Sequence, residues 1–336
     1  MKIIDGGVTA AKGFKAASTA AEIKYKGRTD MAMVFSEVPC VAAGTFTTNV
    51  VKAAPVRWDQ DIVYNHQGAR AVICNSGIAN ACTGEEGFGY CRETAKAASE
   101  SLGIPEDSVL VASTGVIGMQ IPIARIANGV KAMAPKLEGS REAGLEAAKA
   151  IMTTDTEKKE AAVEIEIGGK TVTVGGMCKG SGMIHPNMCT MLGFITSDVD
   201  ISKELLQEAL SEDIKDTYNM VSVDGDTSTN DTLLVLANGL AGNPEITEEN
   251  EDYRAFAAAL NQVNTYLAKK MAGDGEGATA LFEVKVVGAE SKEQAVALSK
   301  SVVSSSLVKA AIYGHDANWG RILCAMGYSG AQFDPE

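Results

Sequence analysis

The sequence predicts a mixed α/β protein in which layers of helix and sheet are stacked. Short β-rich runs alternate along the chain with longer Ala-rich segments of helical period. Two alternating runs flank Gly168-Gly169, a two-residue hairpin signal that requires antiparallel pairing. Long helices can each cover one face of a sheet, so this pattern favours stacked layers over a regular doubly wound parallel sheet.

The first half of the chain mixes strands with helices. Its β-rich runs predict strands at 31–35, 41–46, 71–75 and 108–113. Helical periodicity predicts helices at 89–103, 123–133 and 141–152. Gly103, with Pro105 shortly after it, is the expected stop signal for the first of these helices.

The second half begins with the hairpin and continues with three more strands and three long helices. The hairpin strands are expected at 163–167 and 170–174, and further strands at 190–196, 231–238 and 281–289. Helices are expected at 202–218, at 252–271 and from Ser291 through residue 309. Ser291 and Gln294 form a capping box that opens the last helix.

The charge balance limits the classes of partner. The 336 residues are 46% hydrophobic and carry 30 basic against 43 acidic side chains, a net charge of −13, with no block of five like charges. Phosphate backbones and anionic membrane surfaces would be repelled, so neither nucleic acid nor a membrane is an expected partner. No run approaches the 18 apolar residues of a membrane span. A local pocket with one or two lysines remains compatible with a small carboxylate.

Cysteine and histidine usage indicates a reducing compartment and no metal site. The seven cysteines include no CxxC pair, so reduced thiols are expected. The N-terminus lacks the apolar core of a signal peptide, and we therefore expect a cytoplasmic protein. His66, His185 and His315 are too scattered along the chain to predict a metal centre.

One threonine stands in an unusual context. The stretch GSGMIHPNMCTMLGF, 180–194, places Thr190 after a Gly-rich segment and before a predicted strand. A threonine hydroxyl is a weak nucleophile, but a threonine at a chain N-terminus has its own α-amino group as the adjacent base. Such a residue must be freed by cleavage, and the small Cys189 would leave room for Thr190 to attack the preceding carbonyl. Composition alone favours the plainer interpretation of a tight turn into a strand.

A second candidate lies in STGVIG, 113–118, at the end of a predicted strand. A sharp Gly-containing turn there can aim backbone N–H groups and the Thr114 hydroxyl at a developing oxyanion. Alone, a Ser-Thr-Gly sequence after a strand usually marks only a turn.

Taken together, these stretches closely resemble the ornithine acetyltransferase family, also called the glutamate N-acetyltransferase family of arginine biosynthesis. KGSGMIHPNMCTMLGFIT, 179–196, is similar to its self-cleavage segment. Further blocks follow in the family's order, and the match runs from Gly6 to the last residue. These blocks are ASTGVIG, AIMTTDT, NMVSVDGDTSTNDT, GDGEGATA and HDANWGRILCAMGYSG.

The resemblance implies a fold, an activity and a set of site residues. The fold is a layered sandwich of mixed, partly antiparallel sheets and helices of the ornithine acetyltransferase/DmpA type, shared with self-processing aminopeptidases and resembling N-terminal-nucleophile hydrolases in chemistry. The activity is transfer of an acetyl group from N-acetylornithine to glutamate through Thr190, giving ornithine and N-acetylglutamate. Thr114 and Gly115 match the family's oxyanion hole. Thr153, Lys179, Thr190 and Glu276 match its substrate-binding residues.

Cleavage between Cys189 and Thr190 would divide the precursor into an N-terminal α chain, 1–189, and a C-terminal β chain, 190–336. Residue 189 is usually alanine in the family and is cysteine here. The chain ends at QFDPE, where family members continue for several dozen residues with an asparagine and a terminal threonine of the substrate pocket. The β chain is therefore expected to be truncated relative to the family.

The resemblance also implies the partners. The substrates are small molecules, no cofactor is expected, and acetyl-CoA is a candidate co-substrate. Cleaved halves are expected to pair, and such pairs to dimerise into a heterotetramer. Two alternatives stay open: an amidase or aminopeptidase using the same N-terminal Thr190, and an inactive amino-acid-binding form that lacks the terminal segment.

Overall fold

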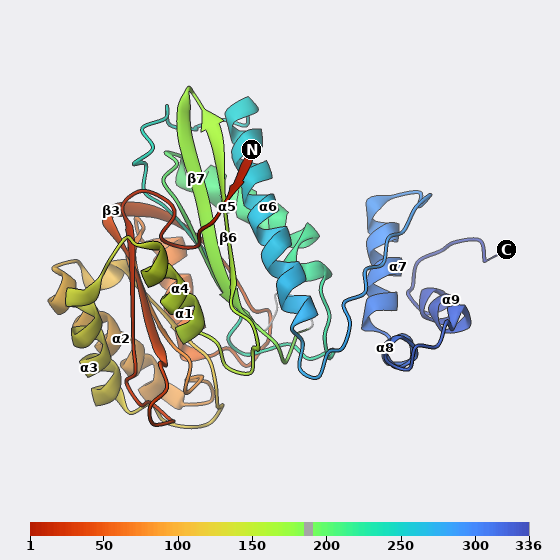
Figure 1. Ribbon diagram of the computed structural model, residues 1–336, viewed down its shortest axis with the longest axis horizontal. Coiled ribbons are helices and arrows are strands. Elements are labelled where there is room, and N and C mark those ends of the chain that lie inside the picture. The colour runs from red at the N-terminus through yellow and green to blue at the C-terminus, as the bar shows by residue number, and fades with distance from the viewer. Residues whose placement is uncertain (185–190, 336) are drawn as a thin grey trace.

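The structure, a computed structural model, describes residues 1–184 and 191–335, and within them nine strands form one mixed sheet (Figure 1). The strand order is β1-β6-β7-β8-β9-β3-β4-β5, and β2 pairs with β3 outside this path. The strands are β1 (Lys2–Ile4), β2 (Phe14–Thr19), β3 (Met31–Phe46), β4 (Ala69–Asn75), β5 (Val109–Ser113), β6 (Lys159–Ile167), β7 (Lys170–Lys179), β8 (Leu192–Ser197) and β9 (Thr232–Ala237).

The pairing is mostly antiparallel, with two parallel pairs, β4 with β5 and β8 with β9. The predicted hairpin is confirmed: Ile167 faces Lys170 across Gly168-Gly169, and β7 then pairs antiparallel with β8. Both glycines have positive φ, which a two-residue hairpin turn of this kind requires.

One long strand, β3, connects the two halves of the sheet. Its register shifts between Phe35 and Cys40, so its first part pairs with β2 and β4 while its last part pairs with β9. Two separate strands were predicted here, at 31–35 and 41–46. The interval between them contains Pro39 and coincides with the register shift, and an irregularity within a strand accommodates a proline.

Helices lie on the outside of both halves. They are α1 (Ala54–Asn65), α2 (Gly84–Leu102), α3 (Ile123–Met133), α4 (Arg141–Ala150), α5 (Lys203–Asp216), α6 (Glu251–Gly273), α7 (Lys292–Ser304), α8 (Ser306–Tyr313) and α9 (Trp319–Gly327). Short 3-10 turns lie at Glu106–Ser108, Ala134–Lys136 and Tyr218–Met220. Figure 1 shows α5 and α6 beside β6 and β7, and α1 to α4 around the other half.

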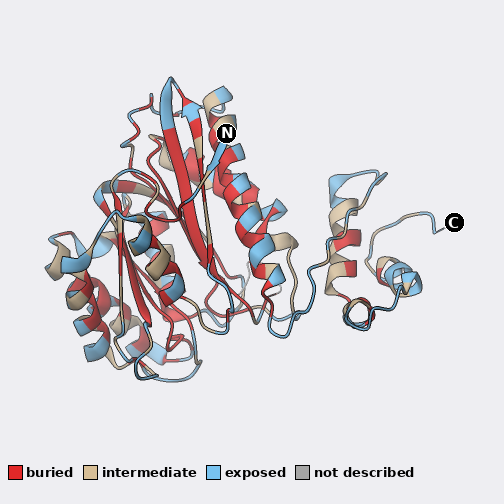
Figure 2. Cartoon of the chain, in the orientation of Figure 1, coloured by how far each residue is buried: buried red, intermediate tan, exposed pale blue. Residues whose placement is uncertain are grey.

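Three apolar layers hold this arrangement together. One core packs α5 and α6 on β6 to β9. A second draws Val72 and Leu110 from one half of the sheet and Leu192 and Leu234 from the other, so the two halves face each other there. A third packs α2 and α3 on β2 and β4. Strands β4, β5, β8 and β9 are accordingly buried almost throughout, whereas β1 is largely exposed (Figure 2). The predicted layered α/β fold is confirmed.

The segment after α6 departs from the prediction. Residues 281–289 were expected to form a strand, but they form no ladder with the described residues. Their alternating pattern is real, because Phe282 and Val284 are half-buried against α7 to α9 while Leu281 and Glu283 are exposed. Burial of one face by helices therefore produces the alternation without a neighbouring strand.

The last three helices form a small lobe beside the sheet (Figure 1). The Ser291 hydroxyl accepts from the Gln294 N–H, which confirms the predicted helix start. The helix expected through residue 309 breaks at Ser305, whose extended backbone and side-chain cap begin α8. In the described part of the chain no single helix is long and apolar enough to cross a membrane, although α7 and α8, bent by 57°, pass that test together.

Candidate active site

A sharp turn after β5 presents Thr114 and Gly115. Thr114 is 8% exposed, and its N–H donates to the carbonyl of Asn75 over 2.9 Å. Gly115 has φ +125°, and a Cβ there would collide with the carbonyl of Gly77. Only glycine fits such a backbone, so the turn predicted in STGVIG is present.

Buried asparagines support this turn. The Asn75 Oδ1 accepts from the N–H groups of Gly77 and Ile78, both over 3.1 Å. The Asn230 amide nitrogen, arriving from the segment before β9, donates to the carbonyls of Ala79 and Ser113 over 2.6 and 2.8 Å. The turn is thus held by side chains from two other segments, the end of β4 and the stretch before β9.

Lys179 ends β7 and reaches the same place. It lies opposite Leu192 in the β7–β8 ladder and is 4% exposed. Its Nζ lies 3.5 Å from the Thr114 Oγ1 and 3.9 Å from the Asp155 Oδ2. Burial lowers the pKa of Lys179 below its ordinary value, while the Asp155 carboxylate opposes that shift. An ammonium group here can meet an incoming carboxylate.

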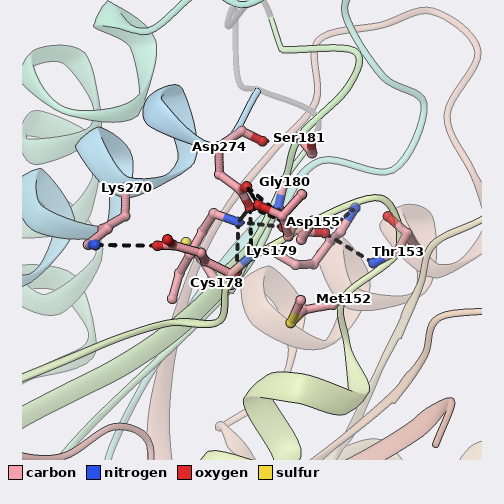
Figure 3. Close-up of polar contacts among 12 residues, drawn as sticks. Met152, Thr153, Asp155, Cys178, Lys179, Gly180, Ser181, Lys270 and Asp274 are labelled. Carbon is pink, nitrogen blue, oxygen red and sulfur yellow. Dashed lines mark hydrogen bonds and ion pairs between the residues drawn. The ribbon is translucent and has the colours of Figure 1, made fainter. Parts of the chain in front are cut away.

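Asp155, Lys159 and Asp274 form a buried charge cluster beside Lys179. Figure 3 shows Asp155 and Asp274 of this cluster next to Lys179. The Lys159 Nζ contacts the Asp155 Oδ1 at 2.7 Å and the Asp274 Oδ2 at 2.6 Å. Burial acts to raise the pKa of Asp155, but Lys179 and Lys159 outweigh it and hold that pKa below its usual value. The pKa of Lys159 is raised in turn, because Asp155 and Asp274 outweigh the effect of burial. All three charges are therefore retained in the interior.

Thr153 and Glu276 are tied to this cluster through the backbone. The Thr153 N–H donates to the Asp155 Oδ2 over 3.0 Å. The Glu276 N–H donates to the carbonyl of Ser181 over 3.0 Å, and the Ser181 hydroxyl donates to the carbonyl of Asp274. The exposed Glu276 carboxylate lies against Gly182, where a Cβ would come within 2.6 Å of its Oε1.

Cys189 and Thr190 lie outside the described residues, and the predictions for them stay predictions. The residue bonded to Thr190, Met191, is described, and its N–H donates to the Asp231 Oδ1 over 3.0 Å. Asp231 is 1% exposed, and its Oδ2 has no hydrogen-bond partner in the described part of the chain. Burial raises the pKa of Asp231 well above its ordinary value, and the Met191 N–H and Lys179 only partly oppose this.

The structure thus brings together Thr114, Gly115, Thr153 and Lys179, with Glu276 on the adjoining loop. Sequence reasoning missed Asp155, Lys159, Asn230, Asp231 and Asp274. Four of them lie inside the quoted blocks AIMTTDT, NMVSVDGDTSTNDT and GDGEGATA, which is a signal that could have found them. Lys159 carries no such signal, because it is one lysine at the start of a strand.

A separate cavity of about 520 Å³ lies between the end of α6 and the helices α7 and α8. Apolar side chains such as Val223, Ala268 and Phe282 line much of it, and Glu276 is at its edge. Thr114, Thr153 and Lys179 are absent from its walls, so of these site residues only Glu276 borders both the cavity and the polar site. Among residues 1–184 and 191–335, no group of three His, Cys, Asp or Glu side chains could hold a metal ion.

Comparison with known proteins identifies the family. The ArgJ family model matches residues 15–336. The arginine biosynthesis bifunctional protein ArgJ of Symbiobacterium thermophilum is 55% identical over 337 residues, covering 100% of this chain and 83% of that protein. The ArgJ of Thermotoga neapolitana is 51% identical, and the match covers 97% of this chain and 81% of that protein. A crystal structure of ArgJ from Bacillus halodurans is 41% identical, has a TM-score of 0.53, and covers 57% of this chain and 97% of that chain. The chain belongs to the ArgJ family, which confirms the resemblance seen in the sequence.

Proposed function

We propose that the protein is an acyltransferase of arginine biosynthesis that moves an acetyl group from N-acetylornithine to glutamate through an acetyl-enzyme on Thr190. The family membership and the sequence blocks around Thr114, Lys179 and Thr190 support this reaction. The observation that carries it is the 3.5 Å approach of the buried Lys179 ammonium group to the Thr114 hydroxyl of the oxyanion-type turn after β5. Lys179 ends β7, which pairs with β8, the strand that follows Thr190.

The first step is self-cleavage. The Thr190 hydroxyl attacks the carbonyl of Cys189, and the Cys189–Thr190 C–N bond breaks as the hydroxyl proton passes to the nitrogen, which leaves an ester and a free α-amino group. Water then hydrolyses the ester to the Cys189 carboxylate and restores the Thr190 hydroxyl. The products are an α chain of residues 1–189 and a β chain of residues 190–336. The halves stay associated and pairs of them form a heterotetramer in the cytoplasm.

Acetyl transfer then follows a double displacement. The Thr190 hydroxyl attacks the acetyl carbonyl of N-acetylornithine while its own α-amino group takes the proton. The C–N bond breaks as that proton returns to the leaving amine, and ornithine departs. The amino group of glutamate attacks the ester, which releases N-acetylglutamate and restores the hydroxyl.

Each remaining site residue has a role that matches its chemistry. The Thr114 hydroxyl and the Gly115 N–H stabilise the oxyanion of both tetrahedral intermediates. Lys179 binds a substrate carboxylate and Glu276 a substrate amino group, as charge-assisted hydrogen bonds require. Thr153 completes the pocket beside Lys179. No cofactor takes part, and acetyl-CoA is a candidate co-substrate.

Glutamate-dependent formation of N-acetylglutamate from N-acetylornithine tests the proposal. We expect ornithine and N-acetylglutamate in equal amounts. When glutamate is omitted, we expect ornithine release to stop once one acetyl group per chain has been transferred to the enzyme. Steady release of acetate without glutamate would instead identify an amidase. Ornithine binding in a thermal-shift experiment, without any turnover, would identify the inactive amino-acid-binding form.

A further inference from the structure

We propose that Lys159 is a positioning residue that holds the substrate-binding segments in register and keeps Lys179 available to the substrate. This inference rests on the proposed function. It concerns a side chain that contacts neither the Thr114 turn nor the exposed Glu276. Its basis is the buried charge cluster of Asp155, Lys159 and Asp274 (Figure 3).

The first arm of the cluster reaches Thr153 and Lys179. The Asp155 carboxylate accepts from the Lys159 ammonium and the Gly180 N–H at Oδ1, each over 2.7 Å. Its Oδ2 accepts from the Thr153 N–H and lies 3.9 Å from the Lys179 Nζ. One carboxylate therefore sets the positions of the loop after α4 and of the end of β7.

The second arm reaches the loop that carries Glu276. The Asp274 carboxylate accepts from Lys159, from the Thr156 N–H and hydroxyl, and from the Glu157 N–H. The Asp274 carbonyl accepts from the Ser181 hydroxyl over 2.7 Å. Lys159 pairs directly with both carboxylates, so it joins this arm to the first, alongside the contacts that Thr156 and Ser181 make with Asp274.

The charges of the interior explain why this lysine matters for Lys179. The side chains of Lys159 and Asp155 are fully buried, and that of Asp274 is 8% exposed. Together with Lys179, the cluster contains two ammonium groups and two carboxylates. Without Lys159 the two carboxylates would lose the ammonium group between them, and Lys179, 3.9 Å from the Asp155 Oδ2, would be the cation left beside Asp155. Unpaired buried charge is strongly unfavourable. Asp155 would then draw Lys179 away from the substrate carboxylate.

The experiment compares Lys159→Met with wild type in the glutamate-dependent assay. We expect the KM for N-acetylornithine and for glutamate to rise by about tenfold or more, with kcat changed by less than about threefold. If Lys159 were purely structural, the Lys159→Met variant would have a lower melting temperature, and both KM values would be unchanged at temperatures below it. That result would overturn the proposal, as would an equal loss in kcat with unchanged KM.

A second variant keeps the test informative if the single variant is unstable. Lys159→Met combined with Asp274→Asn removes one charge of each sign and restores the balance with Asp155 and Lys179. We expect this double variant to reverse at least half of the increase in log KM that Lys159→Met causes. If the effects of the two substitutions on KM were instead additive in the double variant, that result would contradict the role assigned to charge balance.

The neighbouring Lys158 supplies a matched control. The Lys158 side chain is 41% exposed and pairs with Glu160, which lies on the face of β6 opposite to Lys159. Lys158→Met should therefore leave kcat and both KM values at wild-type levels. Wild type that makes no N-acetylglutamate at all would refute the proposed function. An active wild type with an unaffected Lys159→Met variant would refute only the inference about Lys159.

Discussion

At the scale of single residues, the Thr114 hydroxyl oxygen accepts from the buried Lys179 ammonium group over 3.5 Å, which leaves the hydroxyl proton to donate to a substrate oxygen. The turn that holds it is fixed by buried asparagine amides and not by exposed loop residues. Such fixed donors cost no reorganisation when charge develops on a substrate oxygen. Catalysis should therefore respond to this hydroxyl more strongly than binding does.

Replacement of Thr114 by alanine tests that expectation. We predict that Thr114→Ala lowers kcat by about 100-fold, because loss of one oxyanion donor typically has that effect, with little change in KM. Thr114→Ser keeps the hydroxyl and should stay within about tenfold of wild type. A large rise in KM with normal kcat would assign Thr114 to substrate binding instead.

Gly115 and Gly118 provide a second pair of variants. Both have positive φ, but a Cβ on Gly115 would collide with the Gly77 carbonyl, whereas a Cβ on Gly118 meets nothing within 4 Å. Gly118→Ala should therefore lower the free energy of unfolding by about 1–2 kcal/mol, the usual cost of positive φ. Gly115→Ala should lower it by clearly more, as measured by urea unfolding. Equal effects would show that the collision is relieved at no cost.

At the scale of elements, a buried carboxyl joins α1 to β5. Asp59 is 0% exposed, and its Oδ1 accepts from the Val111 N–H over 2.8 Å. Its Oδ2 has no hydrogen-bond partner in the described part of the chain. Burial raises the pKa of Asp59 well above its ordinary value, and the Val111 N–H only partly opposes that shift.

This shift predicts a pH dependence of stability. Above the unfolded-state pKa of about 3.9, the unfolded chain releases a proton that folded Asp59 retains, so stability falls as pH rises toward the folded pKa. Asp59→Asn lacks this loss. Its stability relative to wild type should therefore grow with pH from about 4 upward, by at most about 1.4 kcal/mol per pH unit. Asp61→Asn, on the exposed face of the same helix, should show no comparable gain in urea unfolding at several pH values.

The sequence predicted most elements because their signals are local. The helix at 123–133 is matched at both ends by α3, and Gly103 ends α2 in a left-handed conformation. The failures depended on tertiary context. Whether Pro39 interrupts a strand, and whether 281–289 finds a partner strand, is decided by neighbours far along the chain. In the site, the hydroxyl, ammonium and carboxylate groups were predicted from sequence blocks, whereas the link through Lys159 requires three segments to be seen together.

At the scale of the whole molecule, the sheet connects the two parts of the chain that cleavage would separate. β7 belongs to the predicted α chain and β8 to the predicted β chain, and the two pair along Val174–Lys179 and Leu192–Ser197. β9 also pairs with β3, so the fragments share one sheet and two apolar cores. Cleaved halves should therefore remain together without a covalent link.

Intact mass spectrometry tests the central claim most directly. The protein is measured under denaturing conditions, alone and after brief exposure to N-acetylornithine. We predict two fragments that divide between Cys189 and Thr190, with the mass of one acetyl group added to the second and removed again by glutamate. A single uncleaved chain without an adduct, or an acetyl group on the first fragment, would contradict the account of Thr190 as a self-generated nucleophile.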